Sequence, residues 1–148
     1  MAQDFPLKLS DMVCFAIYSS ANALARAYQP ILAKLDLTYP QFLVMLVLWE
    51  NDDQTVSQIG AKLGLDSGTL TPLLKRLEAA GRIQRRRDAQ DERQVRITLT
   101  DAGHALRQAA ADVPEAIICA LGQPLDELID MRERLFNIRD NLVTARAK

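Results

Sequence analysis

Hydrophobic residues recur every three or four positions over the first part of the chain, which is typical of an amphipathic helix. Between residues 11 and 35 they are Val13, Ile17, Ala21, Leu24, Tyr28, Ile31 and Leu35. The pattern predicts one long helix over 11–35, with Ser10 as its N-cap. The next segment, LTYPQFLVMLVLWEN, is apolar nearly all round, and Pro40 suits a first helical turn. We expect a short buried helix there; a buried strand is the alternative.

Two shorter helices joined by a tight turn are predicted in the middle of the chain. TVSQIGAKLGL indicates a two-residue strand followed by a short helix capped by Ser57. DSGTLTPLLKRLEAAG indicates a second helix, with Asp66 or Ser67 as its cap. Pro72 has no amide proton and belongs in a first turn, so this helix either starts near Thr69 or bends at its beginning.

The hydrophobic period changes to two after the second of these helices. Val95, Ile97 and Leu99 alternate with polar residues, which indicates a strand with one buried face. The segment RIQRRR (82–87) is its expected partner, and DAQDE (88–92) is the expected turn.

Two helical segments are predicted after the hairpin. The first is capped by Thr100 or Asp101 and runs to about Leu121, with a kink at Pro114. The last helix begins near Pro124, and its hydrophobic residues step by three and four positions: Leu128, Met131, Leu135, Ile138 and Leu142. This coiled-coil-like seam indicates a dimer interface; packing on its own domain is the alternative.

The composition narrows the class of protein. The 148 residues are 49% hydrophobic and 25% charged, which suits one domain with its own core. There is no run of about eighteen apolar residues and no signal-peptide pattern, so we expect a cytoplasmic protein without a membrane partner. With two cysteines, Cys14 and Cys119, and a single histidine, His104, neither a zinc site nor a His-based nucleophilic triad is expected.

The formal net charge of −1 conceals an uneven distribution. Residues 1–54 hold three basic and six acidic groups, and residues 101–148 hold six basic and eight acidic groups. Residues 55–100 hold nine basic and five acidic groups, which gives this middle segment a charge of +4. A basic segment between acidic ends predicts a surface for a polyanion; chance clustering is the alternative.

The two middle helices followed by a basic hairpin have the order of a winged helix-turn-helix. The second helix of such a pair presents small polar donors to base edges in the major groove, and here these are Ser67, Thr69 and Thr71. Lys75 and Arg76 are placed to reach phosphates from the flank of that helix.

The hairpin supplies cations for an adjacent groove or for the DNA backbone. They are Arg85, Arg86, Arg87 and Arg93. The alternative is that the arginine run is only a solvated strand end.

The stretch DSGTLTPLLKRLEAAGRIQRRRDAQDERQVRITLTDAGHAL resembles the MarR family of dimeric transcriptional regulators. DER at 91–93, followed by ITLTDAG, matches the wing signature of that family, and the resemblance extends over most of the chain. We therefore expect a mainly α fold with a small β-hairpin in a single domain over 1–148. The winged helix-turn-helix would occupy 40–100, and the helices of 10–35 and 101–146 would form the dimer.

The resemblance also implies how the wing works. In such proteins the wing carboxylate orients an arginine that enters the minor groove, which assigns these roles to Asp91 and Arg93. A plain turn residue is the alternative for Asp91. The implied partner is double-stranded DNA, read by a homodimer as a pseudo-palindromic operator with half-sites about one helical turn apart.

One branch of the family, OhrR, senses organic hydroperoxides through a cysteine near the start of the first helix, and Cys14 lies there. Tyr28 and Tyr39 resemble the tyrosines that bond to the thiol of the partner subunit, and Tyr18 is expected to line the pocket. Cys119 resembles the second cysteine of the two-cysteine type. The resemblance implies a repressor, not an enzyme, that needs no cofactor and is induced by an organic hydroperoxide.

This chemistry requires a thiolate at Cys14. At an ordinary pKa of about 8.5 only about 3% of a thiol is ionised at pH 7, so the positive end of a helix dipole would help. The resulting sulfenic acid would condense with Cys119 of the partner to a disulfide. If the two α-carbons start more than about 7 Å apart, helices must move, which would release the operator.

Other interpretations remain open at this stage. Phe15, Ile17, Phe42 and Trp49 would line a pocket for an alkyl hydroperoxide or belong to the core. Free buried cysteines usually behave as small hydrophobes. A repressor released by a small aromatic or phenolic ligand, a thiol peroxidase and a constitutive architectural DNA binder are the alternative functions.

Overall fold

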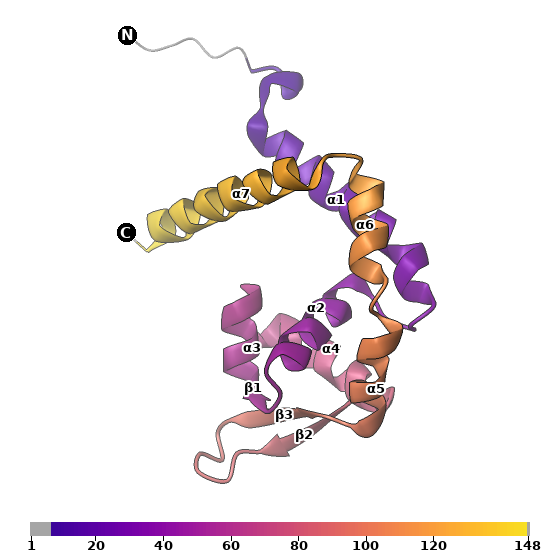
Figure 1. The fold of residues 1–148 in the computed structure, drawn as a ribbon. Coiled ribbons are helices and arrows are strands. Elements are labelled where there is room, and N and C mark those ends of the chain that lie inside the picture. The colour runs from indigo at the N-terminus through magenta and orange to yellow at the C-terminus, as the bar shows by residue number, and fades with distance from the viewer. Residues whose placement is uncertain (1–6, 148) are drawn as a thin grey trace. The chain divides into compact units, whose positions relative to one another are not determined.

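The structure, a computed structural model, describes residues 7–147 and is drawn in Figure 1. The chain divides into two compact units, one ending at Val113 and the other beginning at Pro114. No helix among residues 7–147 has both the length and the hydrophobicity needed to cross a membrane. In chain order the elements are η1 (Leu9–Asp11), α1 (Val13–Ala33), α2 (Tyr39–Glu50), β1 (Gln54–Thr55), α3 (Val56–Leu63), α4 (Ser67–Ala79), β2 (Ile83–Arg87), β3 (Val95–Leu99), α5 (Asp101–Ala109), α6 (Val113–Leu121) and α7 (Leu125–Arg146).

Helix α1 is shorter than the predicted helix over 11–35, because a separate 3₁₀ turn precedes it. The cap predicted at Ser10 is wrong. The Ser10 hydroxyl donates to the Asp11 carboxylate at 3.0 Å, and Met12 occupies the cap position without a side-chain hydrogen bond. The second half of α1 reaches the core, where Leu32 is fully buried.

Helix α2 confirms the helical interpretation of the apolar segment over the strand. Thr38 caps it: the Thr38 hydroxyl accepts from the Gln41 amide at 3.4 Å, and the Gln41 side chain accepts from the Thr38 amide at 2.9 Å. Its apolar residues are buried on several sides at once: Phe42, Val44, Met45, Val47 and Leu48.

Helix α3 is capped by Thr55, so the prediction of Ser57 is wrong. The strand β1 ends at Thr55, whose hydroxyl accepts from the Gln58 amide at 3.2 Å. A β-carbon added to Gly60 would lie 2.6 Å from the carbonyl oxygen of Leu65, so the turn after α3 closes tightly only over a glycine.

Helix α4 begins at Ser67, so the first of the two alternatives, a late start near Thr69, is wrong. The Asp66 carboxylate caps it by accepting from the Thr69 amide at 2.7 Å. Pro72 lies inside the helix. The face of α4 that packs on the body of the domain carries Leu70, Leu74 and Leu77, all at most 1% exposed.

The three strands form one antiparallel sheet in the order β1-β3-β2. Arg85 of β2 pairs with Ile97 of β3, and Arg86 pairs with Arg96. Ile97 and Leu99 are buried, which confirms the strand predicted from the alternation. The two-residue strand predicted at the start of TVSQ is present, but it begins one residue earlier, at Gln54, and it pairs with the middle of β3.

The predicted kinked helix from Thr100 to Leu121 is instead two helices. Thr100 caps α5 by accepting from the Gly103 amide at 3.0 Å. The break precedes Pro114, which is the second residue of α6. A proline is favourable in a first turn because its missing amide proton has no helical partner there, so Pro114 begins a helix rather than bending one.

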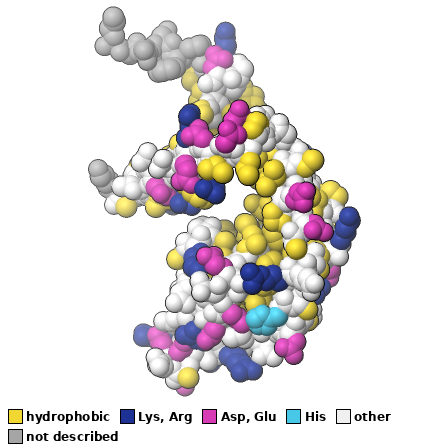
Figure 2. Space-filling view, in the orientation of Figure 1, with side chains coloured by type: hydrophobic (Ala, Val, Ile, Leu, Met, Phe, Trp, Pro, Cys, Tyr) yellow, Lys and Arg dark blue, Asp and Glu magenta, His cyan; other side chains and the backbone are white. Residues whose placement is uncertain are grey.

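Helix α7 starts next to Pro124, as predicted, and none of its 22 residues is buried. Figure 2 shows hydrophobic side chains uncovered on the surface of the C-terminal helices. In the other unit the core lies between α1, α2, α4 and the sheet. Trp49 of α2 also donates its indole N–H to the Gly103 carbonyl of α5 at 2.9 Å.

Candidate DNA-binding surface and thiol sites

The second helix of the helix-turn-helix turns the predicted base-contacting residues away from the core. Ser67 and Thr69 are exposed in the first turn of α4, and Thr71 is half-buried. Lys75 and Arg76 are exposed further along, and neither forms an ion pair with a described residue. The helix therefore offers hydroxyls at its start and cations along its flank.

The Asp66 cap also changes the electrostatics of this helix end. The hydrogen bond from the Thr69 amide holds the pKa of Asp66 below its usual value, so the carboxylate is ionised at neutral pH. Because Asp66 already takes that amide, fewer N–H groups remain for a DNA phosphate.

The arginines of strand β2 divide into two kinds. Arg85 lies on the inner face of the sheet, half-buried, and forms an ion pair with Glu78 of α4. That contact lowers the pKa of Glu78. Arg86 and Arg87 are exposed, and within 7–147 the only side-chain hydrogen bond found for them runs from Arg86 to the Gln84 amide oxygen at 2.8 Å. Arg85 thus ties the wing to α4, whereas the other two face solvent.

At the wing tip the structure brings Asp91 and Arg93 together. The Asp91 carboxylate accepts from both the amide and the Nε of Arg93, each at 3.1 Å, and these bonds lower the pKa of Asp91. The Arg93 side chain is 91% exposed, against 35% for that of Asp91. The Asp91 carboxylate is therefore partly buried, and the Arg93 guanidinium that it binds extends into solvent.

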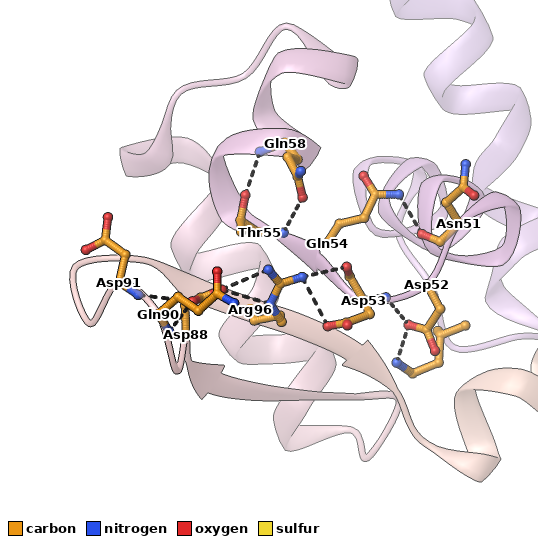
Figure 3. A network of polar contacts seen from close by, with 11 residues as sticks. Asn51, Asp52, Asp53, Gln54, Thr55, Gln58, Asp88, Gln90, Asp91 and Arg96 are labelled. Carbon is orange, nitrogen blue, oxygen red and sulfur yellow. Dashed lines mark hydrogen bonds and ion pairs between the residues drawn. The ribbon is translucent and has the colours of Figure 1, made fainter.

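A partly buried contact behind the wing was missed by the sequence analysis (Figure 3). Arg96 of β3 donates to the Asp88 carboxylate from Nε at 3.0 Å and from Nη2 at 2.8 Å. Its Nη1 donates to the carbonyl oxygen of Asp53 at 3.0 Å. A signal did exist: Arg86 and Arg96 fall opposite each other in the hairpin, and like charges so placed need a counter-ion.

The two thiols are both free and exposed, each in its own unit of the chain. Cys14 is the second residue of α1, in its first turn, and Cys119 lies in the last turn of α6. Tyr18, one turn after Cys14, is 67% exposed. The interpretation of these cysteines as buried hydrophobes is therefore wrong for the single chain.

Tyr28 and Tyr39 lie against each other where α1 meets α2. Their rings are stacked with centroids 4.2 Å apart, and the ring of Phe42 is 6.0 Å from that of Tyr28. Burial raises the pKa of both phenols, and the nearby Tyr39 adds to the shift at Tyr28. Within residues 7–147 no hydrogen bond is found for either hydroxyl, so both have capacity for an outside partner.

The four residues considered for a peroxide pocket have different environments. Phe42 is 3% exposed and belongs to the core, and Trp49 packs against that core. Phe15 is 38% exposed, and Ile17 is half-buried. The core interpretation therefore holds for Phe42, whereas Phe15 is open to solvent in the single chain.

Known proteins resemble the chain over most of its length. A family model described as "Transcriptional regulator SarA/Rot" matches residues 26–109. The regulator TtmR of Methylorubrum extorquens strain PA1 is 49% identical over 140 residues, which cover 95% of this chain and 72% of TtmR. The organic hydroperoxide resistance transcriptional regulator of Bacillus subtilis strain 168 is 42% identical over 136 residues, covering 92% of each chain.

A solved structure agrees with these sequence matches. AbfR of Staphylococcus epidermidis, in its reduced form bound to DNA, superposes with a TM-score of 0.77 at 39% identity. The match covers 91% of this chain and 94% of AbfR. The winged helix-turn-helix of the structure and the sequence matches support the same family assignment. The chain, which the SarA/Rot model matches, belongs to the MarR-type family of winged helix transcriptional regulators and is a DNA-binding transcriptional regulator.

Proposed function

We propose that the protein is a transcriptional repressor that senses organic hydroperoxides by oxidation of Cys14. A disulfide from Cys14 of one subunit to Cys119 of its partner would release the operator. The observation that carries the proposal is an exposed thiol in the first turn of a long helix. It occurs in a chain 42% identical to a regulator named for organic hydroperoxide resistance.

The proposed reaction balances without a cofactor. The Cys14 thiolate attacks one peroxide oxygen, the O–O bond breaks, and the alcohol leaves after taking a proton. The sulfur becomes a sulfenic acid. The Cys119 thiol then attacks that sulfur, forming the S–S bond and releasing water. Cys14 is exposed in the first turn of α1, so a hydroperoxide can reach its sulfur.

A second subunit would complete the thiol site. The hydroxyls of Tyr28 and Tyr39 have room for a further hydrogen bond, and a phenol donor stabilises a thiolate. Tyr18 projects from the same part of α1 as Cys14 and would line the approach. The uncovered apolar residues of α7 supply a dimer surface. We therefore infer a homodimer in which the helices of 10–35 and 101–146 pack together.

In that dimer the two winged helix regions, 40–100 of each chain, would read a pseudo-palindromic operator in the cytoplasm. We assign Ser67, Thr69 and Thr71 to base edges in the major groove, and Arg93, oriented by Asp91, to the minor groove. The remaining cations would contact phosphates: Lys75, Arg76, Arg86 and Arg87. Arg85 acts through its ion pair with Glu78, which orients the hairpin on α4.

Structures of AbfR record two different oxidised forms. AbfR has been solved overoxidised and bound to DNA, and also with a disulfide formed. By analogy, we infer that the S–S bond, and not added oxygen on sulfur, releases this repressor. The inference gives Cys119 a role that a Cys14-only sensor would not require.

The test compares the wild type with Cys14→Ser and Cys119→Ser in mobility-shift assays with and without cumene hydroperoxide. The DNA is a duplex selected from a random-sequence pool on the reduced wild type. We expect the wild type to leave the DNA and to form a cross-linked dimer on a non-reducing gel. Cys14→Ser should stay bound with its remaining thiol intact, and Cys119→Ser should stay bound although Cys14 is oxidised.

Three outcomes would contradict the proposal. One is peroxide-dependent release of Cys14→Ser. Another is continuous consumption of peroxide in the presence of dithiothreitol while the DNA stays bound, which would identify a thiol peroxidase; without a reductant, the proposed sensor leaves the DNA and stalls after one oxidation per site. The last is release of all three proteins by a phenol such as salicylate with their thiols unchanged, which would identify a ligand-controlled repressor.

A further inference from the structure

The wing depends on a carboxylate that is nearly hidden from solvent. The Asp88 side chain is 11% exposed at the end of β2, just where three consecutive arginines finish. Its Oδ2 receives both hydrogen bonds from Arg96. Arg96 and Arg86 are cross-strand neighbours, so Asp88 neutralises a like-charge pair that would otherwise push the hairpin apart.

The second oxygen of the same carboxylate holds the loop at the wing tip. Asp88 Oδ1 accepts from the amide of Gln90 at 2.7 Å and from the amide of Asp91 at 3.1 Å. Backbone bonds close the loop around it, from the Asp88 amide to the Gln94 carbonyl and from the Gln94 amide to the Asp91 carbonyl, both 2.9 Å. One side chain therefore fixes both strand β3 and the loop.

The other end of the contact reaches the body of the domain (Figure 3). Arg96 Nη1 donates to the backbone carbonyl of Asp53 at 3.0 Å and lies 3.4 Å from its carboxylate. Asp53 precedes β1 in a left-handed conformation, with φ of 59°, beside the start of the helix-turn-helix. The wing loop is thus connected to the segment that leads into α3.

We propose that Asp88 and Arg96 are positioning residues for DNA binding, which fix the wing loop so that Asp91 can present Arg93 to the minor groove. The contacts run without a gap from Asp53 through Arg96 and Asp88 to the amide of Asp91, and from the Asp91 carboxylate to Arg93. The proposal rests on the role proposed above for Arg93.

The physical reason is the entropy of an exposed loop. Arg93 is 91% exposed, and within residues 7–147 the only side-chain hydrogen bond found for it is the one to Asp91. If Asp91 itself is free to move, the cost of ordering both residues falls on the binding step and weakens the complex. When the loop is already fixed, the entropy of ordering these residues is lost during folding and does not weaken DNA binding.

The decisive variant is Asp88→Ala, because charge and positioning predict opposite signs for it. Removing an acidic group next to DNA should strengthen binding if only net charge matters. If Asp88 positions Arg93, the same change weakens binding, by roughly threefold to tenfold, since bonds to a charged group are lost. The matched control is Glu92→Gln, which removes an equal charge from an exposed wing residue and should bind as well as the wild type or better.

The experiment measures the dissociation constant and its salt slope for reduced protein on the selected duplex. Arg93→Ala should lower the slope by about one contact. We expect Asp88→Ala to lower it similarly, and to have no further weakening effect when Arg93 is already alanine. Asp88→Asn keeps an oxygen for the loop amides but loses the ionic bond to Arg96, so it should fall between the wild type and Asp88→Ala.

Hydrogen exchange provides a readout that does not depend on DNA. In Asp88→Ala the amides of Gln90 and Asp91 should exchange faster, while the helical amides of α4 stay protected. Circular dichroism of each variant confirms that the domain is folded.

Each contrary result has a distinct meaning. Binding of Asp88→Ala at wild-type strength or tighter, with Arg93→Ala weakened, overturns the positioning role alone. Equal weakening by Asp88→Ala with and without Arg93 also overturns it, since Asp88 would then act elsewhere. If Arg93→Ala binds like the wild type, the wing contact and the positioning role both fail.

Discussion

The winged helix region and the C-terminal helix differ in whether their hydrophobic residues are buried within the chain. Helix α2 buries five of its 12 residues and α4 buries three of its 13. Helix α7 buries none of its 22, and Met131, Leu135, Ile138 and Leu142 are between 39% and 63% exposed. The winged helix is therefore complete within one chain, whereas α7 presents a surface that only another surface can complete.

The polar contacts of the two regions show the same contrast. In the winged helix several of them join residues far apart in sequence, such as the Leu99 amide to the Asp52 carboxylate at 2.9 Å. In α7 the ion pairs join residues one or four positions apart, such as Arg134 with Asp130 at 2.8 Å. Local pairs on an exposed helix contribute little to stability. We therefore expect α7 to gain its stability by association with a second subunit.

The largest effect should follow from placing charges in the apolar seam of α7. We expect Leu135→Glu with Ile138→Glu to convert a dimer into monomers, because four carboxylates would face one another in the interface. Losing the second half-site should reduce operator affinity by roughly 10²- to 10⁴-fold. Sedimentation and mobility shift measure the two effects.

The matched control places the same charges on exposed polar positions of α7, as Asn137→Glu with Asn141→Glu. It should remain dimeric and bound to DNA. A seam variant that sediments like the wild type would show that α7 is not the dimer surface and would break the comparison.

The next effect compares one leucine from each region. Leu74→Ala empties a site that is 1% exposed in the winged helix, and it should cost about 2–5 kcal/mol of unfolding free energy at any protein concentration. Leu142→Ala should destabilise mainly through the dimer. Its effect on the thermal midpoint should therefore change with dilution, which calorimetry over a range of protein concentrations would detect.

A smaller effect compares the polar contacts of the two regions by replacing one threonine with alanine in each. The Thr100 hydroxyl caps α5 and also donates to the Gly81 carbonyl at 2.6 Å, so Thr100→Ala should cost about 1 kcal/mol. Thr144 of α7 only donates to the Asp140 carbonyl one turn earlier. Thr144→Ala should leave the denaturant midpoint unchanged; equal costs at the two sites would contradict the contrast.

The sequence predicted the elements of the winged helix well because local rules decide them. The period of two at Val95, Ile97 and Leu99 gave the strand β3, and the apolar run after Pro40 gave the buried helix α2. The predicted caps Ser10 and Ser57 failed because capping depends on where the preceding turn or strand ends, within one or two residues.

The candidate site was predictable only where its contacts are local. Asp91 and Arg93 are two residues apart, and their pairing follows from the wing motif. The bridge from Asp88 through Arg96 to Asp53 spans more than forty positions, and no periodicity encodes it. The environment of Cys14 was harder still, since we propose that a second chain supplies the surface that encloses it.

The smallest effect we predict concerns Tyr28 and Tyr39, where the exposed first helix joins the core. Burial raises the pKa of both phenols in the folded protein, so their neutral forms are favoured by folding. The stability they contribute is then fully present below the ordinary tyrosine pKa of about 10 and is lost as pH rises through the raised value. Tyr28→Phe should flatten the decline of the thermal midpoint above about pH 10, and the ultraviolet absorbance of the wild type should show the late formation of tyrosinate.

Tyr18→Phe removes an exposed phenol outside the stack and is the control. If Tyr28→Phe and Tyr18→Phe gave the same alkaline curve, the stacked pair would contribute nothing to joining α1 to the core.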